Sequence, residues 1–390
     1  MKAFFTIVLM YFCFNTADAA DERIWWPKAK INGQPVRLCF DTGTSVPVVL
    51  YSTVAQRLGL KVTPPDYQPD PGRFAFGTTE MCDLNLGNTN VRTSLSVGQM
   101  PEYLKSPEDG ILGWPALRSD ILFLDATRDK IRGFAAVPKK AIAWTRLCVQ
   151  TNLNILGFEV VDQNGNRANI LVDTGIAFGI KLSPQKWQEW KRAHTNQPTT
   201  IEAYYTPSLG AVIAEEAWAR EIALGPLVLT DVPVMEADAT DVIVGSSAQS
   251  QYEATLGLAA LNRLDNIIDG KNGIAYLHLK RTPASPYQHN RLGADFAPNN
   301  DSKNDDLVAH VAAGSPAHEA GIRDGDVLLK INGHDVTKWR TDTNPPPQVP
   351  AFMQPAKTKV EFTLKRGDTV FSTTAVLRNI LPSGGANHSN

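Results

Sequence analysis

The chain has 390 residues, which is enough for two or three domains that each bury a hydrophobic core. Hydrophobic residues make up 43% and charged residues 20%, the proportions of an ordinary folded protein. A formal net charge of -2, without a basic stripe, argues against nucleic acid as a partner, because phosphate binding needs clustered Lys and Arg.

The N-terminus has the pattern of a secretory signal peptide. Lys2 precedes an apolar run over residues 3–14, and small residues at 16–20 offer a cleavage site. The run is short for a membrane span, and an uncleaved anchor is the alternative. We therefore expect residues 1–20 to be removed, the mature protein to be exported to the periplasm or the extracellular space, and no stable membrane span to remain.

Three cysteines follow the signal peptide, so they cannot all pair with one another. Cys39 lies in an apolar strand-like run, which favours a buried thiol. A disulfide between Cys82 and Cys148 is permitted by export but has no support in the sequence. The cysteines and histidines fit no zinc motif, and we expect neither a metal nor a cofactor.

Two Asp-Thr-Gly triplets stand in matching surroundings. The first begins at Asp41 and the second at Asp173, each after an apolar run of strand type. One triplet alone is a weak signal, because such an aspartate often caps its own turn. Here, however, an Asn-Gly pair, which favours a hairpin, precedes each aspartate by nine residues.

The match continues downstream of each triplet. Leu112-Gly113 has its counterpart in Leu256-Gly257, and twelve residues after each of these glycines an aspartate follows two apolar residues. Five markers thus recur in the same order with equal short spacings. The chain therefore contains an internal duplication.

This combination of hairpin, strand, Asp-Thr-Gly and apolar-apolar-Gly resembles the retropepsin-like aspartic proteases over roughly residues 24–280. The resemblance implies a mainly β fold with two β-barrel lobes, at residues 21–137 and 144–280. Two lobes in one chain would form a pseudo-dimer, so a monomer would be sufficient for a complete site.

By the same resemblance, Asp41 and Asp173 form the catalytic pair. Residues of the two loops would support it: Thr42 and Thr174 would hold the loops together, while the backbone at Gly43 and Gly175 would approach the carboxylates. Gly113 and Gly257 would let a strand pass close to each loop.

Two hairpin-like stretches are candidates for flaps that close over substrate. The first is at residues 71–79 and contains Phe74 and Phe76; the second begins with Tyr204 and Tyr205. An ordinary surface hairpin is an equally good interpretation of any single residue in them.

The residue after the glycine differs between the two triplets. It is Thr44 in the first and Ile176 in the second. A hydroxyl at this place can donate a hydrogen bond to the carboxylate and favour its ionisation. We therefore expect Asp41 to be the base and Asp173 the partner that carries the proton, although the bulk of Ile176 raises the question whether the second motif is fully active.

The sequence changes character after a linker at residues 281–290. The run from Ser315-Pro316 to Asp324-Gly325 resembles a bacterial PDZ domain, a small β-barrel with helices, over residues 291–381. The resemblance implies that the loop at Leu292, Gly293 and Ala294 binds a C-terminal carboxylate. Four prolines within 344–354, where a groove helix is expected, favour the alternative of a docking module without a free groove.

The resulting expectation is an exported aspartic endopeptidase. A water activated between Asp41 and Asp173 would hydrolyse peptide bonds of a peptide or protein substrate, and the PDZ domain would bind peptide or protein C-termini. The alternative is an exported, non-catalytic peptide-binding protein that keeps the protease fold.

Overall fold

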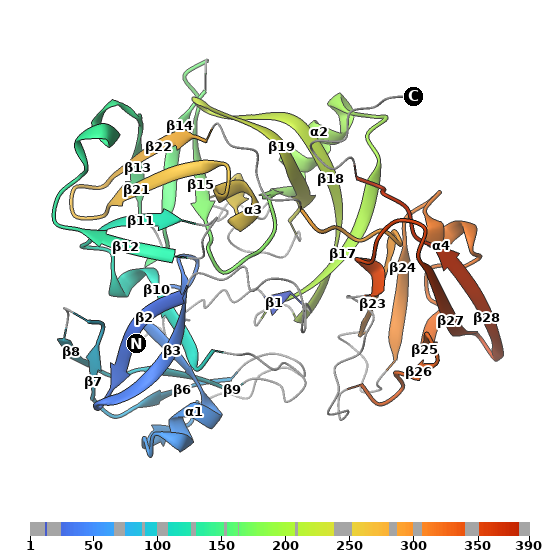
Figure 1. The fold of residues 1–390 in the computed structure, drawn as a ribbon, viewed down its shortest axis with the longest axis horizontal. Helices are drawn as coiled ribbons and strands as arrows, with labels where there is room; N and C mark the ends of the chain where they lie inside the picture. Colours follow the sequence, from blue (N-terminus) through green and yellow to red (C-terminus); the bar gives the residue numbers. More distant parts are fainter. Residues whose placement is uncertain are drawn as a thin grey trace.

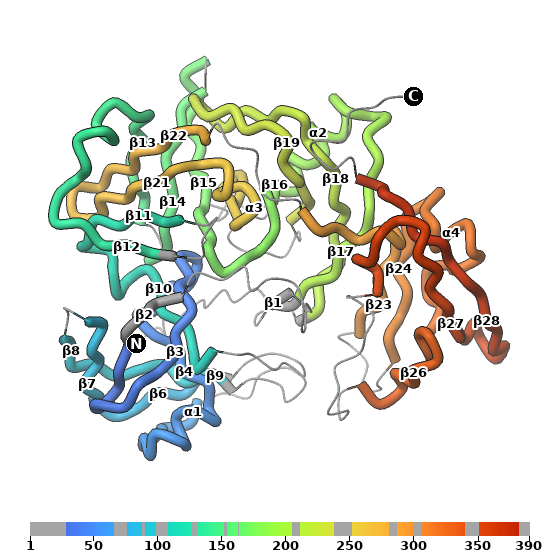
Figure 2. The backbone as a smooth tube through the Cα atoms, viewed as in Figure 1, coloured from blue at the N-terminus to red at the C-terminus, as the bar shows by residue number. Residues whose placement is uncertain are grey.

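The computed structural model of the chain describes residues 12–13, 25–65, 75–87, 90–99, 108–125, 130–151, 154–162, 164–206, 210–237, 252–280, 287–298, 306–339 and 351–381. These residues form mainly β-structure, arranged as two adjacent lobes and a C-terminal domain (Figure 1). Figure 2 follows the backbone from the blue first lobe through the green second lobe to the red C-terminal domain. No helix in the described part is long and apolar enough to cross a membrane.

The first lobe is built from short strands with little helix. Its elements are β2 (Trp25–Ile31), β3 (Gln34–Asp41), β4 (Val48–Tyr51), α1 (Ser52–Arg57), β5 (Val62–Thr63), β6 (Ala75–Thr79), β7 (Cys82–Asn85), β8 (Asn90–Thr93), β9 (Ser96–Gln99), β10 (Gly110–Gly113), η1 (Trp114–Ala116), β11 (Ile121–Asp125), β12 (Lys130–Phe134) and η2 (Lys139–Ala143). The expected hairpin joins β2 and β3 through Asn32 and Gly33, whose φ angles of 47° and 79° are those of a two-residue turn.

Three paired strands hold the first Asp-Thr-Gly. Strand β10 lies between β3, to which it is parallel, and β4, to which it is antiparallel. Every residue of β4 and β10 is buried, as expected for strands covered on both faces. Gly113 at the end of β10 pairs with Asp41 at the end of β3.

The second lobe repeats this arrangement. Its elements are β13 (Thr145–Gln150), β14 (Gly157–Val161), β15 (Arg167–Val172), β16 (Ile180–Leu182), α2 (Pro184–Ala193), β17 (Thr199–Thr206), β18 (Gly210–Leu224), β19 (Leu227–Glu236), β20 (Ala254–Leu256), α3 (Leu258–Leu261), β21 (Leu264–Asp269) and β22 (Ile274–Leu279). Strand β20 lies parallel to β15 and antiparallel to β16, which is the relation of β10 to β3 and β4. The duplication seen in the sequence is thus present in the topology.

Two local features of the second lobe depend on side chains that cap the backbone. Helix α2 begins after Ser183, whose hydroxyl accepts a hydrogen bond from the N–H of Lys186 at 3.4 Å. The second Asn-Gly lies in the expected hairpin, between β14 and β15, in a loop of five residues between Val161 and Arg167. The Asp162 carboxylate accepts two backbone N–H bonds at 2.8 Å there and holds this loop.

A shared sheet joins the two lobes. Strand β11 of the first lobe pairs antiparallel with β21 of the second, with Ile121 opposite Asp269. Strands β12 and β22 extend the sheet on either side, as Figure 1 shows. The lobes are therefore fixed relative to each other by backbone hydrogen bonds.

The C-terminal domain has a separate small sheet and its own core. Its elements are β23 (Ala294–Pro298), β24 (Leu307–Val311), α4 (Pro316–Glu319), β25 (Val327–Ile331), β26 (His334–Asp335), β27 (Lys359–Arg366) and β28 (Thr369–Val376). The rings of Phe296, Phe352 and Phe362 pack together in that core, with centroids 5.8 to 6.2 Å apart. Most of the proline-rich stretch before Phe352 lies outside the described residues.

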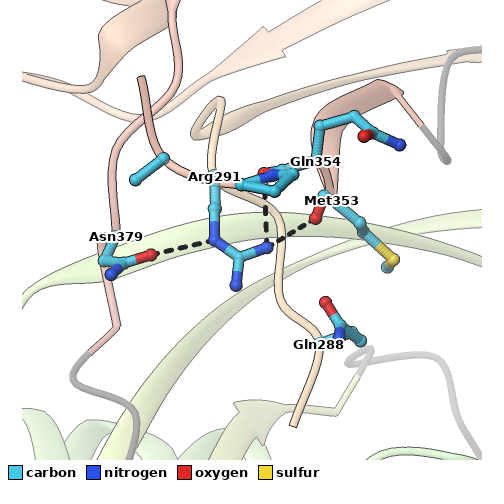
Figure 3. A pocket seen from close by; sticks show the side chains of 7 residues that line it. Gln288, Arg291, Met353, Gln354 and Asn379 are labelled. Atoms are coloured by element: carbon cyan, nitrogen blue, oxygen red, sulfur yellow. Dashed lines mark hydrogen bonds between the residues drawn. The ribbon is translucent and has the colours of Figure 1, made fainter. Parts of the chain in front are cut away.

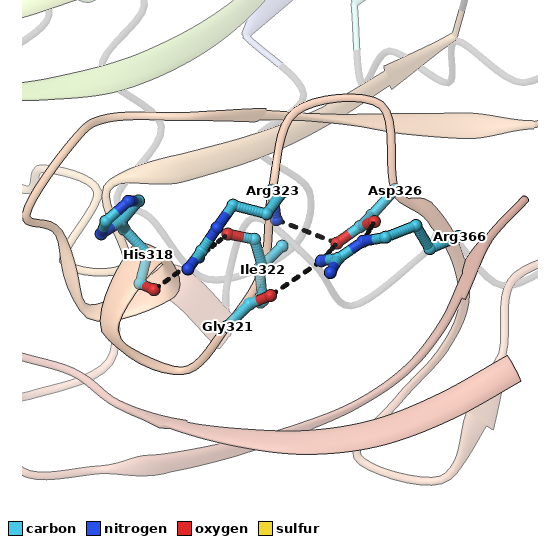
Figure 4. A network of polar contacts seen from close by, with 6 residues as sticks. All are labelled: His318, Gly321, Ile322, Arg323, Asp326 and Arg366. Atoms are coloured by element: carbon cyan, nitrogen blue, oxygen red, sulfur yellow. Dashed lines mark hydrogen bonds and ion pairs between the residues drawn. The ribbon is translucent and has the colours of Figure 1, made fainter. Parts of the chain in front are cut away.

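One polar network fastens the turn after α4 to the sheet (Figure 4). Arg366 on β27 donates two hydrogen bonds of 2.7 Å to the buried carboxylate of Asp326 and one of 2.8 Å to the carbonyl of Gly321. The N–H of Arg323 also donates to Asp326, at 2.9 Å. The bidentate geometry fixes the turn that leads into β25.

The structure describes three of the cysteines and the end of the linker. Cys39, Cys82 and Cys148 are all free thiols, so the disulfide considered for Cys82 and Cys148 is not formed, and Cys39 is buried as expected. The linker at 281–290 lies outside the described residues up to 286, but His289 and Asn290 are buried. The end of the linker is therefore packed rather than free.

Candidate active site

The two Asp-Thr-Gly loops meet between the lobes. Strand β3 delivers Asp41 and strand β15 delivers Asp173, whose N–H donates to the carbonyl of Leu256 at 2.9 Å. Both carboxylates are buried, with 2% and 0% of the residue exposed. The structure thus brings together two aspartates that lie 132 residues apart in the sequence.

The two threonines bind the loops to each other symmetrically. The hydroxyl of Thr42 donates to the carbonyl of Val172 at 2.5 Å and accepts the N–H of Thr174 at 3.1 Å. The hydroxyl of Thr174 donates to the carbonyl of Phe40 at 2.7 Å and accepts the N–H of Thr42 at 3.1 Å. Four buried hydrogen bonds therefore fix the relative position of the aspartates.

The two glycines make room for the carboxylates of the opposite lobe. A Cβ on Gly43 would lie 2.5 Å from Oδ2 of Asp173, and a Cβ on Gly175 would lie 2.6 Å from Cγ of Asp41. Neither position therefore has space for a side chain. The N–H of each glycine donates to the carboxylate of its own triplet at 2.8 Å.

Gly113 and Gly257 occupy equivalent places behind the two loops. A Cβ on Gly113 would lie 2.1 Å from the carbonyl oxygen of Val46, and one on Gly257 would lie 2.3 Å from that of Phe178. Both glycines therefore let another stretch of backbone pass close to the loop, as the resemblance to aspartic proteases implies.

The hydrogen bonds around the two carboxylates are unequal. The hydroxyl of Thr44 donates to Oδ2 of Asp41 at 2.8 Å. Oδ2 of Asp173 receives no hydrogen bond from an N–H or hydroxyl in the described part of the chain. Ile176, which replaces the threonine, is fully buried in an apolar cluster with Phe178.

The pKa directions follow this inequality. Burial raises the pKa of Asp41, but the hydrogen bonds of Thr44, Asp173 and the N–H of Gly43 oppose the rise. Burial raises the pKa of Asp173 well above its usual range, and the charge of Asp41 and a hydrogen bond with it raise that pKa further. Asp41 is thus the carboxyl group that ionises more readily.

A buried lysine near Asp173 was not found from the sequence. Lys181 on β16 is fully buried, and its charge lowers the pKa of Asp173. Its Nζ lies 5.0 Å from the ring centroid of Tyr204. The only sequence signal was a charged residue in an otherwise apolar strand of three residues.

The flap candidates have different outcomes. Phe74 lies outside the described residues, and Phe76 on β6 is half-buried against the core of the first lobe. Strands β17 and β18 form the second hairpin, in which Tyr204 is buried against Phe178. Tyr205 also belongs to β17, but its side chain lies outside the described part. The role of either hairpin as a flap stays a prediction.

The expected carboxylate-binding loop precedes β23. Leu292 and Ala294 are fully buried, and Gly293 has a φ of +68° and no room for a Cβ beside Ser315. A pocket of 490 Å³ lies next to this loop (Figure 3). Its wall contains Arg291, which donates to the side chain of Asn379 at 2.9 Å and to the carbonyl of Met353 at 2.6 Å.

Metal binding has no support in the part of the chain that the structure describes. No group of three or more His, Cys, Asp or Glu side chains there could hold a metal ion.

Family models match part of the first lobe and part of the C-terminal domain. A family model described as aspartyl protease matches residues 28–116, and one described as PDZ domain matches residues 307–366. The chain contains an aspartyl protease domain and a PDZ domain. The aspartyl protease domain, the PDZ domain and the mainly β fold class expected from the sequence are confirmed. The aspartyl protease match includes Asp41 and Gly113 and ends before the second triplet.

Two solved structures are among those that match the chain, both at low identity. The retroviral protease-like domain of Ddi1 from Leishmania major is 18% identical, covering 29% of this chain and 77% of that chain, with a TM-score of 0.19. Basic 7S globulin from soybean is 12% identical, covering 69% of this chain and 94% of that chain, with a TM-score of 0.36. A search of curated proteins found no match.

Proposed function

We propose that the protein is an aspartic endopeptidase whose catalytic pair is Asp41 and Asp173. The observation that carries this proposal is the reciprocal packing of the loops, in which each carboxylate lies against the glycine of the opposite triplet. Two buried carboxyl groups that hydrogen-bond each other share one proton, because ionising both would place like charges in contact.

The unequal surroundings assign a role to each aspartate. Asp41, with the Thr44 hydrogen bond, is the ionised base that takes a proton from a bound water. Asp173 keeps its proton and donates a hydrogen bond to the carbonyl oxygen of the scissile peptide. The water oxygen then bonds to the carbonyl carbon while Asp173 protonates the carbonyl oxygen. The C–N bond breaks as Asp41 passes the proton taken from the water to the leaving nitrogen, and Asp173 recovers its proton from the resulting diol.

An edge of β17 supports binding of an extended peptide. The two-residue strand β1 (Phe12–Cys13) pairs antiparallel with β17, with Phe12 opposite Tyr205 and Cys13 opposite Tyr204. A substrate chain can pair with the same edge by strand addition once the N-terminal segment has been removed. We infer export from the signal pattern at residues 1–20.

The PDZ domain is proposed to bind the C-termini of peptides or proteins. The loop before β23 and the neighbouring Arg291 offer N–H donors and a positive charge for a terminal carboxylate. Because both aspartates belong to one chain, we propose that the monomer is the active unit.

Peptide-library cleavage over a range of pH tests the endopeptidase. Asp41→Asn and Asp173→Asn should each abolish cleavage, since each removes one of the two carboxyl groups, whereas the exposed Asp368→Asn should leave it unchanged. Pepstatin, a mimic of the transition state, should inhibit the wild type. A folded wild type that cleaves neither short nor tailed substrates would favour the non-catalytic peptide-binding protein.

A further inference from the structure

Asn290 occupies the loop that is expected to bind a carboxylate. Its side-chain oxygen accepts the N–H of Leu292 at 2.9 Å and the N–H of Gly293 at 3.2 Å. Its side-chain nitrogen donates to the carbonyl of Ala294 at 2.8 Å. Asn290 is only 2% exposed, so its amide sits in the loop as a bound acceptor and donor rather than at the surface.

The edge of β23 that faces away from β24 is also closed. On the β24 side, the N–H of Ala312 donates to the carbonyl of Gly293, and Ala294 pairs with Val311. By the alternation of an antiparallel ladder, the N–H and carbonyl groups of Ala294 and Phe296 face away from β24, toward the edge that an added strand would use. The side chain of Asn290 donates to the carbonyl of Ala294, and the Asp295 carboxylate accepts the N–H of Phe296 at 2.7 Å.

The second lobe binds the side chain of Asp295 and the backbone of Asn290. The N–H of Ala203 on β17 donates to Oδ2 of Asp295 at 3.1 Å, and the hydroxyl of Thr200 donates to the carbonyl of Asn290 at 2.8 Å. Strands β17 and β23 are in contact and lie side by side in Figure 1. The strand that forms the second hairpin therefore covers the binding edge of the PDZ domain.

Three carboxyl groups are buried at this contact. Glu202 and Glu216 come from the second lobe and Asp295 from the PDZ domain. Burial raises the pKa of Glu216 to about 8 and that of Asp295 to about 6. Burial and the charges of the other two raise the pKa of Glu202 well above its usual range. Their ionisation therefore weakens the contact as the pH rises.

The groups around these carboxyls do not neutralise them fully. The hydroxyl of Tyr287 donates to Glu216 at 2.5 Å. His289 in the same segment is buried, and burial together with the charge of Arg291 lowers its pKa to about 4, so it is neutral at higher pH. A contact of this kind is suited to opening, because each of these buried carboxyl groups that ionises opposes it.

We propose that Asn290 and strand β17 act as an internal ligand of the PDZ domain, so that a peptide with a free C-terminal carboxylate binds by displacing both. The inference rests on the peptide-binding function proposed above. Displacement would release β17 and thereby connect occupancy of the PDZ domain to the hairpin of the second lobe. The apparent affinity of the closed protein for peptide is reduced by the fraction of open molecules.

Fluorescence anisotropy on the full chain tests this inference. The probe is a library of fluorescein-labelled peptides with free C-termini, and Asp41→Asn is the background so that peptides are not cleaved. Asn290→Ala and Thr200→Val should each raise the affinity by on the order of tenfold, because each weakens the internal ligand. The exposed Asn196→Ala is the matched control and should leave affinity unchanged, and amidated peptides should show no gain.

Hydrogen exchange provides a second measurement on the same protein. Saturating peptide should speed exchange at the N–H of Ala203 while slowing it at Leu292 and Gly293. A wild type that binds carboxylate peptides as tightly as both variants, with Ala203 unaffected, would overturn the internal ligand and leave the peptide-binding function standing. Absence of binding in the wild type and in both variants would instead refute the peptide-binding function itself.

Discussion

The two lobes support their aspartates by opposite means. Beside Asp41 the first lobe places the hydroxyl of Thr44, and Val49 on β4 faces Ile111 on β10. In the second lobe Ile176 replaces the hydroxyl, and the residues equivalent to the Val49 and Ile111 pair are Lys181 and Thr255. The duplicated backbones thus place their aspartates in different electrostatic surroundings. This difference can make one aspartate the base and the other the acid of a single reaction.

The largest expected effect comes from substituting the glycine that each Asp-Thr-Gly triplet contributes to the packing of the two loops. Gly43→Ala would place a methyl group against Asp173, and Gly175→Ala would place one against Asp41. Each should lower kcat/KM by at least about 100-fold, because displacement of a catalytic group by 1 Å has an effect of that size. Gly133→Ala, where a Cβ meets nothing within 4 Å, is the control. Similar activity in all three variants would contradict the reciprocal packing.

A smaller effect is expected from substituting Thr44, the residue after the first glycine, which differs from its counterpart in the second lobe. Thr44→Ala removes a hydrogen bond that lowers the pKa of Asp41, so that pKa should rise. Because the base must be ionised, the acidic limb of the pH–rate profile should then move to higher pH. Thr44→Ser retains the hydroxyl and should keep the limb in place. An unmoved limb in Thr44→Ala would remove the assignment of Asp41 as the base.

The smallest effect is expected at Lys181. Its charge lowers the pKa of Asp173, so Lys181→Met, which retains much of the side-chain volume, should let that pKa rise. Because Asp173 acts while protonated, the alkaline limb of the profile should move to higher pH and the acidic limb should move less. A shift confined to the acidic limb would show that Lys181 acts on Asp41 instead.

Much of the site could be predicted because its signals are local. Each Asp-Thr-Gly, the turn at Asn32 and the helix start at Ser183 depend on neighbours in the sequence. The duplication added the long-range information that two such loops face each other. The hydrogen bond from Thr44 to Asp41 also follows from the spacing of three residues.

The features that were missed depend on contacts that no local pattern encodes. Lys181 approaches Asp173 only through the pairing of β16 with β20, and Thr200 meets Asn290 across 90 residues. Asn290 lies just before the PDZ loop at residues 292–294, and in the sequence it resembles an ordinary linker residue. The hairpin at the second Asn-Gly was expected, whereas the length of its loop, which Asp162 caps, was not predicted.

The sheet shared by the lobes also sets the time at which activity can arise during synthesis. Strand β11 must await β21, whose last residue is Asp269, before the sheet between the lobes can close. A growing chain that has produced only the first lobe contains Asp41 but not yet Asp173. Under the proposed function, the site is therefore complete only after most of the chain has been made.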